Sequence, residues 1–131
     1  MDRMDRMKMQ DFLHKELTEK IIEACLEVMK ELGSGFLESV YEKALLIILK
    51  QKSIAAQSQV PLKVSFRGEV VGEFFADIFV ENKVIVELKA VKALMPVLQA
   101  QLINYLKATG IDVGLLINFG TPKLEVRRVH R

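Results

Sequence analysis

The chain has 131 residues, of which 50% are hydrophobic and 27% charged, and these proportions are typical of one globular domain with its own core. Its single cysteine, Cys25, excludes an internal disulfide and a zinc site made of several cysteines, and no apolar run reaches the roughly 18 residues of a membrane span. A net charge of +2 does not by itself indicate nucleic-acid binding, so such a function must be argued from a site.

The first residues carry no targeting pattern. Residues 1–6 are charged and no apolar core follows them, so no signal peptide is visible and we expect a cytoplasmic protein. We expect residues 1–16 to form a frayed N-terminal extension and residues 17–131 to form the folded domain.

Two helices are expected next. Apolar residues recur at helical spacing from Ile21 to Leu32, and Gly33 then provides a C-terminal stop. A second helix should follow Gly35 and run to about Gln51. Its expected buried stripe consists of Leu37, Val40, Tyr41, Ala44, Leu45 and Ile48.

Strands are expected after a polar linker over residues 53–59. Alternating or β-branched runs predict three strands, over residues 62–66, 70–80 and 84–88. Gly68 separates the first two, and the turn chemistry of residues 81–83 makes a hairpin of the last two.

A crossover helix and a buried strand complete the pattern. Pro96 can open the helix and Gly110 can close it, and the almost wholly apolar run 113–119 predicts a buried strand parallel to the third. After Pro122 apolar and polar residues alternate weakly, and this pattern predicts an edge strand. The order is ααβββαβ with a final strand, so the fold class is α/β, a single layered domain with a mixed central sheet flanked by helices.

The most informative residues are two carboxylates in the expected hairpin. If its turn centres on Asn82, Asp77 and Glu87 face each other, with Cβ atoms about 4.5–5.5 Å apart. Two such carboxylates repel, so a cation or a shared proton must compensate, and oxygen ligands suit Mg²⁺ or Mn²⁺. Lys89 lies on the same strand face. That face also carries three apolar residues, which suggest that it is covered: Phe75, Phe79 and Ile85. The alternative is a solvated sheet face on which Lys89 merely bridges Glu87.

Three helical residues are candidates to join this pair. Glu38 borders the buried stripe of its helix and can face the sheet, although such a glutamate can equally reach into solvent. Gln101 and Tyr105 are four residues apart and share one face of the crossover helix, which is also compatible with an ordinary helix edge and one snorkelling tyrosine.

These residues add up to a resemblance. The stretch from Gly35 through Glu38 to Tyr41 resembles the signature of the GxxExxY protein family, which lies within the PD-(D/E)XK nuclease-like superfamily. The similarity extends from about residue 17 to 119 and includes four further stretches: 75–77, 83–91, 100–110 and 114–120. Two positions depart from the pattern: Ala76 replaces the proline before Asp77, and Leu98 stands where a histidine is expected.

The resemblance implies a restriction-endonuclease-like fold and Mg²⁺-dependent cleavage of nucleic acid, with DNA favoured over RNA and Mn²⁺ as a substitute metal. By this resemblance Asp77, Glu87 and Lys89 form the catalytic core, and Glu38 is the acidic residue of the first core helix. Gln101 and Tyr105 take the positions on the following helix. The expected metal ligands are Asp77, Glu87, Glu38 and the backbone carbonyl of Leu88. A homodimer would help so small a domain to engage a duplex.

The residues are also compatible with two other classes of function. A catalytically silent module could bind nucleic acid or a protein through the same surface, and an assembly module would leave Asp77 and Glu87 exposed and apart. The basic residues of the tail could contact phosphates or could simply solubilise it. They are Lys123, Arg127, Arg128 and Arg131.

Overall fold

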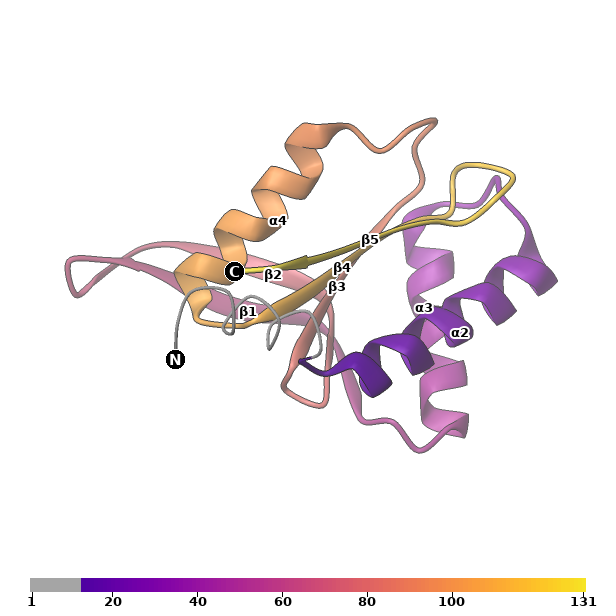
Figure 1. The fold of residues 1–131 in the computed structure, drawn as a ribbon, viewed down its shortest axis with the longest axis horizontal. Helices are drawn as coiled ribbons and strands as arrows, with labels where there is room; N and C mark the ends of the chain where they lie inside the picture. The colour runs from indigo at the N-terminus through magenta and orange to yellow at the C-terminus, as the bar shows by residue number, and fades with distance from the viewer. Residues whose placement is uncertain (1–12) are drawn as a thin grey trace.

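The computed structural model describes residues 13–131, and it confirms the α/β layered fold (Figure 1). Its helices are α2 (Lys15–Leu32), α3 (Glu38–Gln51) and α4 (Pro96–Thr109). Its strands are β1 (Ala56–Phe66), β2 (Glu69–Val80), β3 (Val84–Lys89), β4 (Val113–Asn118) and β5 (Glu125–His130). The first twelve residues of the expected N-terminal extension lie outside the described part of the chain, and Lys15 and Glu16 already belong to α2.

One mixed sheet connects all five strands in the order β1-β2-β3-β4-β5. The β2–β3 hairpin has the predicted register, with Val80 opposite Val84 and Phe79 opposite Ile85. Strands β3 and β4 pair in parallel, as expected for strands joined by the crossover helix α4, and the edge strand β5 returns antiparallel to β4. Residues Glu81 and Asn82 make the tight hairpin turn with positive φ angles.

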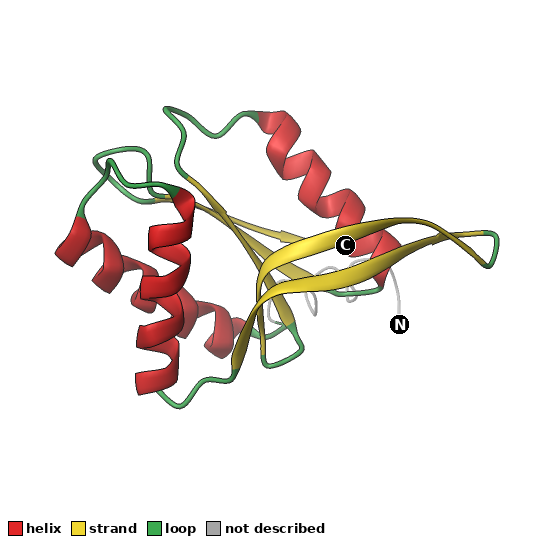
Figure 2. Ribbon diagram, turned by 180° about the vertical axis from the view of Figure 1, so that it is seen from behind, coloured by secondary structure: helices red, strands yellow, loops and turns green. Residues whose placement is uncertain are grey.

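The sheet separates two hydrophobic cores. Alternate side chains of β3 and β4, including Val86 and Leu115, pack against α2 and α3, whereas Ile85 and Leu116 pack against α4 on the opposite face. Figure 2 shows α2 and α3 together on one side and α4 on the other. The buried thiol of Cys25 belongs to the first core, and burial raises its pKa to about 12, which is typical of an inert packed cysteine.

Tyr41 fixes the connection between α2 and α3. Its hydroxyl donates to the Gly33 carbonyl at 2.6 Å and accepts from the Phe36 amide at 3.2 Å, and its ring stacks on Phe119 with centroids 4.4 Å apart. Gly35 has a φ of 112°, a conformation that favours glycine. Gly35 and Tyr41 therefore shape this loop.

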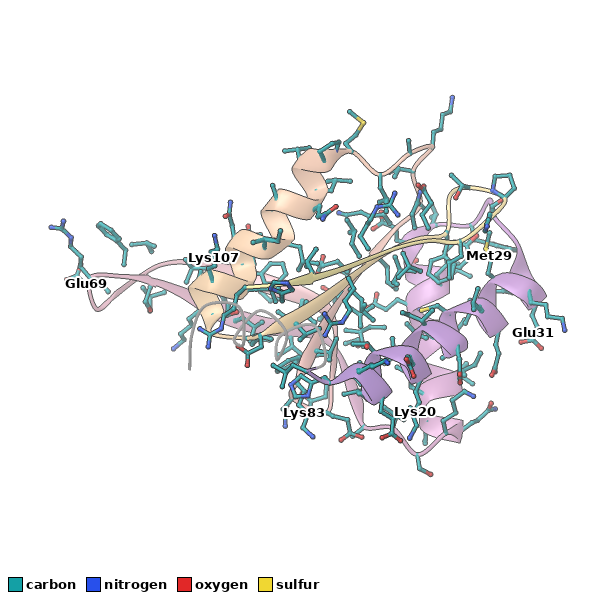
Figure 3. All side chains as sticks on the ribbon, viewed as in Figure 1. Lys20, Met29, Glu31, Glu69, Lys83 and Lys107 are labelled. Atoms are coloured by element: carbon teal, nitrogen blue, oxygen red, sulfur yellow. The ribbon has the colours of Figure 1, made fainter. Side chains whose placement is uncertain are left out.

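Strand β1 corrects one prediction, because it begins at Ala56 and includes most of the expected linker 53–59. The polar residues there are compatible with a strand because β1 lies at the edge of the sheet and is largely exposed. Together β1 and β2 form a long twisted ribbon that projects beyond the helices (Figures 1 and 2), and Figure 3 shows Glu69 at its tip, far from Lys83 in the β2–β3 turn.

Three apolar residues are more exposed than their patterns predicted. Leu37 is 78% exposed because it precedes the first turn of α3, and Val40 on that turn is 37% exposed. Phe75 is 52% exposed because it lies on the face of the ribbon that no helix covers. None of the helices in the described part of the chain is long and apolar enough to cross a membrane.

Candidate functional site

The candidate site lies where β2 and β3 separate. Their ladder ends at the pair of Ile78 and Val86, so Asp77 and Glu87 are the next residues on each strand. The Asp77 amide donates to Glu87 Oε1 at 3.2 Å, and the Leu88 amide donates to Asp77 Oδ2 at 2.8 Å. The two carboxylates therefore take hydrogen bonds that the strand ladder would otherwise make.

β2 also changes layer at this point. Ile78 and Val80 pack in the core beneath α2 and α3, whereas Phe74 and Ala76 pack in the core beneath α4. Strong twist of a two-stranded ribbon allows one strand face to serve both cores. The carboxylates lie at this crossing, within reach of side chains from both layers.

Glu87 has a strongly perturbed acidity. Its pKa is raised from 4.5 to about 8, first by burial and then by the neighbouring negative charge of Asp77. The backbone hydrogen bond from Asp77 and the positive charge of Lys89 act in the opposite direction but do not cancel it. At neutral pH the metal-free pair is thus expected to retain a proton, which is the compensation that two facing carboxylates require.

Lys89 ends β3 on the same strand face as Glu87, and the structure fixes the chain directly behind it. The Phe119 amide donates to the Lys89 carbonyl, and the buried Asn118 side chain makes two 2.9 Å hydrogen bonds with the backbone of Val91. Gly120 packs so closely that an added Cβ would lie 2.3 Å from the Val91 carbonyl oxygen. β4 therefore holds the loop that follows the lysine.

A pocket of about 200 Å³ lies between α4 and the sheet and brings together four of the predicted site residues. They are Glu87, Lys89, Gln101 and Tyr105. Its apolar wall includes Phe74, on which the Tyr105 ring stacks with centroids 4.0 Å apart. Leu98, at the position where the resemblance led us to expect histidine, also lines this wall. The predicted shared face of Gln101 and Tyr105 is thus turned toward Glu87 and Lys89.

Glu38 is not brought into the pair. It lies exposed on the first turn of α3, and within residues 13–131 no three His, Cys, Asp or Glu side chains are grouped closely enough to hold one metal ion. The predicted three-carboxylate cluster is therefore absent from the described structure. By its helical angle Glu38 should face the sheet. Because it is the first residue of α3, however, its side chain is exposed to solvent.

Two further residues belong to this region, and sequence patterns did not reveal them. Gln59 Nε2 donates to Glu42 Oε1 at 3.1 Å and to Asp77 Oδ1 at 3.4 Å, and so links α3 to the carboxylate pair. Glu42 lies one turn after Glu38 on the same helix face. That spacing is the only sequence signal that could have drawn attention to it.

Comparison with known proteins gives the family. A family model described as the PD-(D/E)XK nuclease superfamily matches residues 15–129. The chain belongs to this superfamily. The crystal structure of SSO0001 matches 71% of the chain with a TM-score of 0.53 and 20% sequence identity, which shows a shared fold. This chain spans about half the length of SSO0001, of which 49% is covered. No curated protein sequence matches the chain.

The PD-(D/E)XK pattern can be placed on the strands of this superfamily member. Ala76 and Asp77 lie in β2, and Glu87, Leu88 and Lys89 end β3. The donor set fits a hard cation, because Mg²⁺ is commonly bound by one or two carboxylates together with water and substrate phosphates. The Leu88 carbonyl points to the same side of β3 as its amide, beyond the last β2 pair, and so faces the gap occupied by Asp77.

The basic tail makes contacts within the protein. Arg131 Nε lies 2.7 Å from Asp112, Arg127 pairs loosely with Glu125 at 3.8 Å, and Arg128 donates to the Leu13 carbonyl. These contacts hold β5 and the start of α2 in place, whereas Lys123 is exposed in the turn before β5.

Proposed function

We propose that the protein is a metal-dependent nuclease that hydrolyses phosphodiester bonds of nucleic acid. One observation carries the proposal: Asp77 and Glu87 are held against each other, and Glu87 lines a pocket together with a lysine, a glutamine and a tyrosine. A protein that served only in assembly would not require two carboxylates in contact, since this contact contributes to the raised pKa of Glu87.

In this proposal the chain's own residues have distinct roles. Asp77, Glu87 and the Leu88 carbonyl would hold Mg²⁺, for which Mn²⁺ could substitute. When bound, the cation would supply a water of lowered pKa and neutralise charge on the phosphate. Lys89 orients that water or stabilises the developing charge, since it ends β3 beside Glu87 and lines the same pocket.

The helix α4 supplies the opposite side of the proposed site. Gln101 is exposed at the pocket and can hydrogen-bond the water or a phosphate oxygen. Tyr105 is held by its stack on Phe74 and supports Gln101 from one turn away. Glu38 remains a proposed contributor from α3 when nucleic acid is bound.

We also propose that the chain is a GxxExxY protein within its superfamily, with Gly35, Glu38 and Tyr41 as the signature. Gly35 and Tyr41 shape the α2–α3 loop and so set where α3 begins. This arrangement assigns a structural reason to two signature positions and leaves the carboxylate of Glu38 accessible.

The test is a cleavage assay on the purified chain. Single- and double-stranded DNA and RNA are each incubated with Mg²⁺, Mn²⁺ or EDTA, and Glu87→Gln is compared with Glu23→Gln, an exposed carboxylate on α2. We expect cleavage of DNA that requires a divalent cation, is lost in Glu87→Gln and persists in Glu23→Gln. Binding without cleavage under every condition would instead identify a catalytically silent binding module.

A further inference from the structure

Gln59 has an unusual backbone for its place in the sheet. It lies in β1 between Ser58, which pairs with Ile78, and Val60, which pairs with Ala76, so it is opposite Asp77. Its φ is 50°, in the left-handed region, although the register on both sides is continuous. A strained residue inside a strand persists only where surrounding contacts compensate.

The contacts that compensate are two carboxylates from different layers. The Gln59 amide nitrogen carries two N–H donors, and these reach Glu42 Oε1 at 3.1 Å and Asp77 Oδ1 at 3.4 Å. Oxygen atoms of α3 and β2 thus converge on the Gln59 amide nitrogen.

We propose that Gln59 is a positioning residue of the carboxylate site and that Glu42 is the α3 carboxylate it ties to Asp77. In the metal-free protein the Gln59 amide bridges the carboxylates of Glu42 and Asp77, and so fixes the position of α3 relative to β2. Glu42 would therefore act on a cation bound at the carboxylate pair indirectly, because its hydrogen bond to Gln59 fixes the amide that orients the Asp77 carboxylate. The inference rests on the proposed metal-dependent function and specifies which residues position that site.

The helix offers a direct comparison between two glutamates one turn apart. Glu42 is half-buried and bonded to Gln59, whereas Glu38 is exposed. If Gln59 transmits the position of α3 to Asp77, removing the charge of Glu42 must affect cation binding more than removing that of Glu38. A helix that served only as packing would make the two changes equivalent.

The experiment is a Mn²⁺ titration of the full chain without nucleic acid, followed by electron paramagnetic resonance of free Mn²⁺ or by calorimetry. Loss of a residue that positions metal ligands typically costs about 10–100-fold in affinity, so we expect at least about tenfold weaker binding for Glu42→Gln. Gln59→Gly, which accepts the positive φ and removes the amide, should weaken binding by about three- to tenfold while melting remains cooperative. Gln59→Asn also tolerates this backbone, and its shorter amide should not restore affinity.

Two further variants separate this inference from the proposed function. Asp77→Asn should lose Mn²⁺ binding, and Glu23→Gln on α2 should bind like the unaltered chain. If Asp77→Asn loses binding but Glu42→Gln and Gln59→Gly do not, or if Glu38→Gln costs more than Glu42→Gln, the role of Gln59 is overturned and the metal site stands. If the unaltered chain does not bind Mn²⁺, or if Asp77→Asn binds it as tightly as the unaltered chain, both are overturned.

Discussion

Replacing Glu87 by glutamine should change how stability depends on pH. In the metal-free folded protein Glu87 keeps its proton up to about pH 8, whereas in the unfolded chain it releases the proton near its ordinary pKa of 4.5. Folding therefore takes up a proton between these two values. Stability from this group is fully present below pH 4.5 and is lost as the pH rises through 8.

The size of the effect follows from the raised pKa. Each pKa unit corresponds to about 1.4 kcal/mol, so a rise from 4.5 to about 8 makes ionisation of Glu87 in the fold cost roughly 5 kcal/mol. Glu87 is half-buried, and water reaching its carboxyl group reduces that cost. We expect the stability difference between the unaltered chain and Glu87→Gln to fall by about 1 kcal/mol per pH unit between about pH 5.5 and 7.5.

Urea unfolding in EDTA at several pH values measures this difference. Glutamine keeps an oxygen for the Asp77 amide, so the substitution removes the titration with little change in the local hydrogen bonds. For Glu23→Gln, an exposed change on α2, the free energy of unfolding should depend on pH as it does for the unaltered chain. Saturating Mg²⁺ should reduce the pH dependence of the free energy of unfolding of the unaltered chain. Parallel pH profiles for the unaltered chain and Glu87→Gln in EDTA would refute the reasoning.

Four other outcomes are expected. Asp77→Asn should abolish Mg²⁺-dependent cleavage while its melting temperature in EDTA stays level or rises, because the repulsion is removed and an oxygen remains for the β3 amide; a clear loss of stability in EDTA would argue for a purely structural aspartate. Lys89→Met should slow cleavage by about 100-fold or more and leave Mn²⁺ affinity within about threefold, so a loss of metal binding would contradict its role. Tyr41→Phe should lower the free energy of unfolding by about 1–2 kcal/mol, measured in urea, since two backbone groups lose their shared hydroxyl partner; unchanged stability would show that this partner is dispensable. Gly120→Ala should cost at least about 2 kcal/mol by the same measurement, because its Cβ would meet the Val91 carbonyl, and a tolerated alanine would mean that the loop moves easily.

The carboxylate pair could be predicted because it depends on local rules. The turn at residues 81–83 fixes which residues face each other, and the two-residue period of a strand then places Asp77 opposite Glu87. Burial and the neighbouring charge follow from that register. Gln101 and Tyr105 were predictable as one helix face, and the crossover geometry of α4 turns that face toward the sheet.

The α3 side of the site could not be predicted in the same way. Glu38 has the right helical angle, but its distance from the sheet depends on where α3 starts, and the Tyr41 loop contacts decide that. Gln59 lies in a polar stretch that carries no strand pattern, and its side chain contacts a helix and a strand that are distant in sequence. Phe75 was expected to be covered, but it lies on the face of the ribbon opposite Phe74 and Ala76, which no helix covers.

The sequence by itself determined the order of helices and strands, the hairpin register and the acidic pair, because hydrophobic period and turn chemistry act over a few residues. Only the tertiary structure decided that Glu42 and Gln59, rather than Glu38, contact the site through Asp77. Which residues make these contacts depends on the position of α3 relative to β1 and β2. That position is set by packing between segments far apart in the chain, which no local pattern encodes.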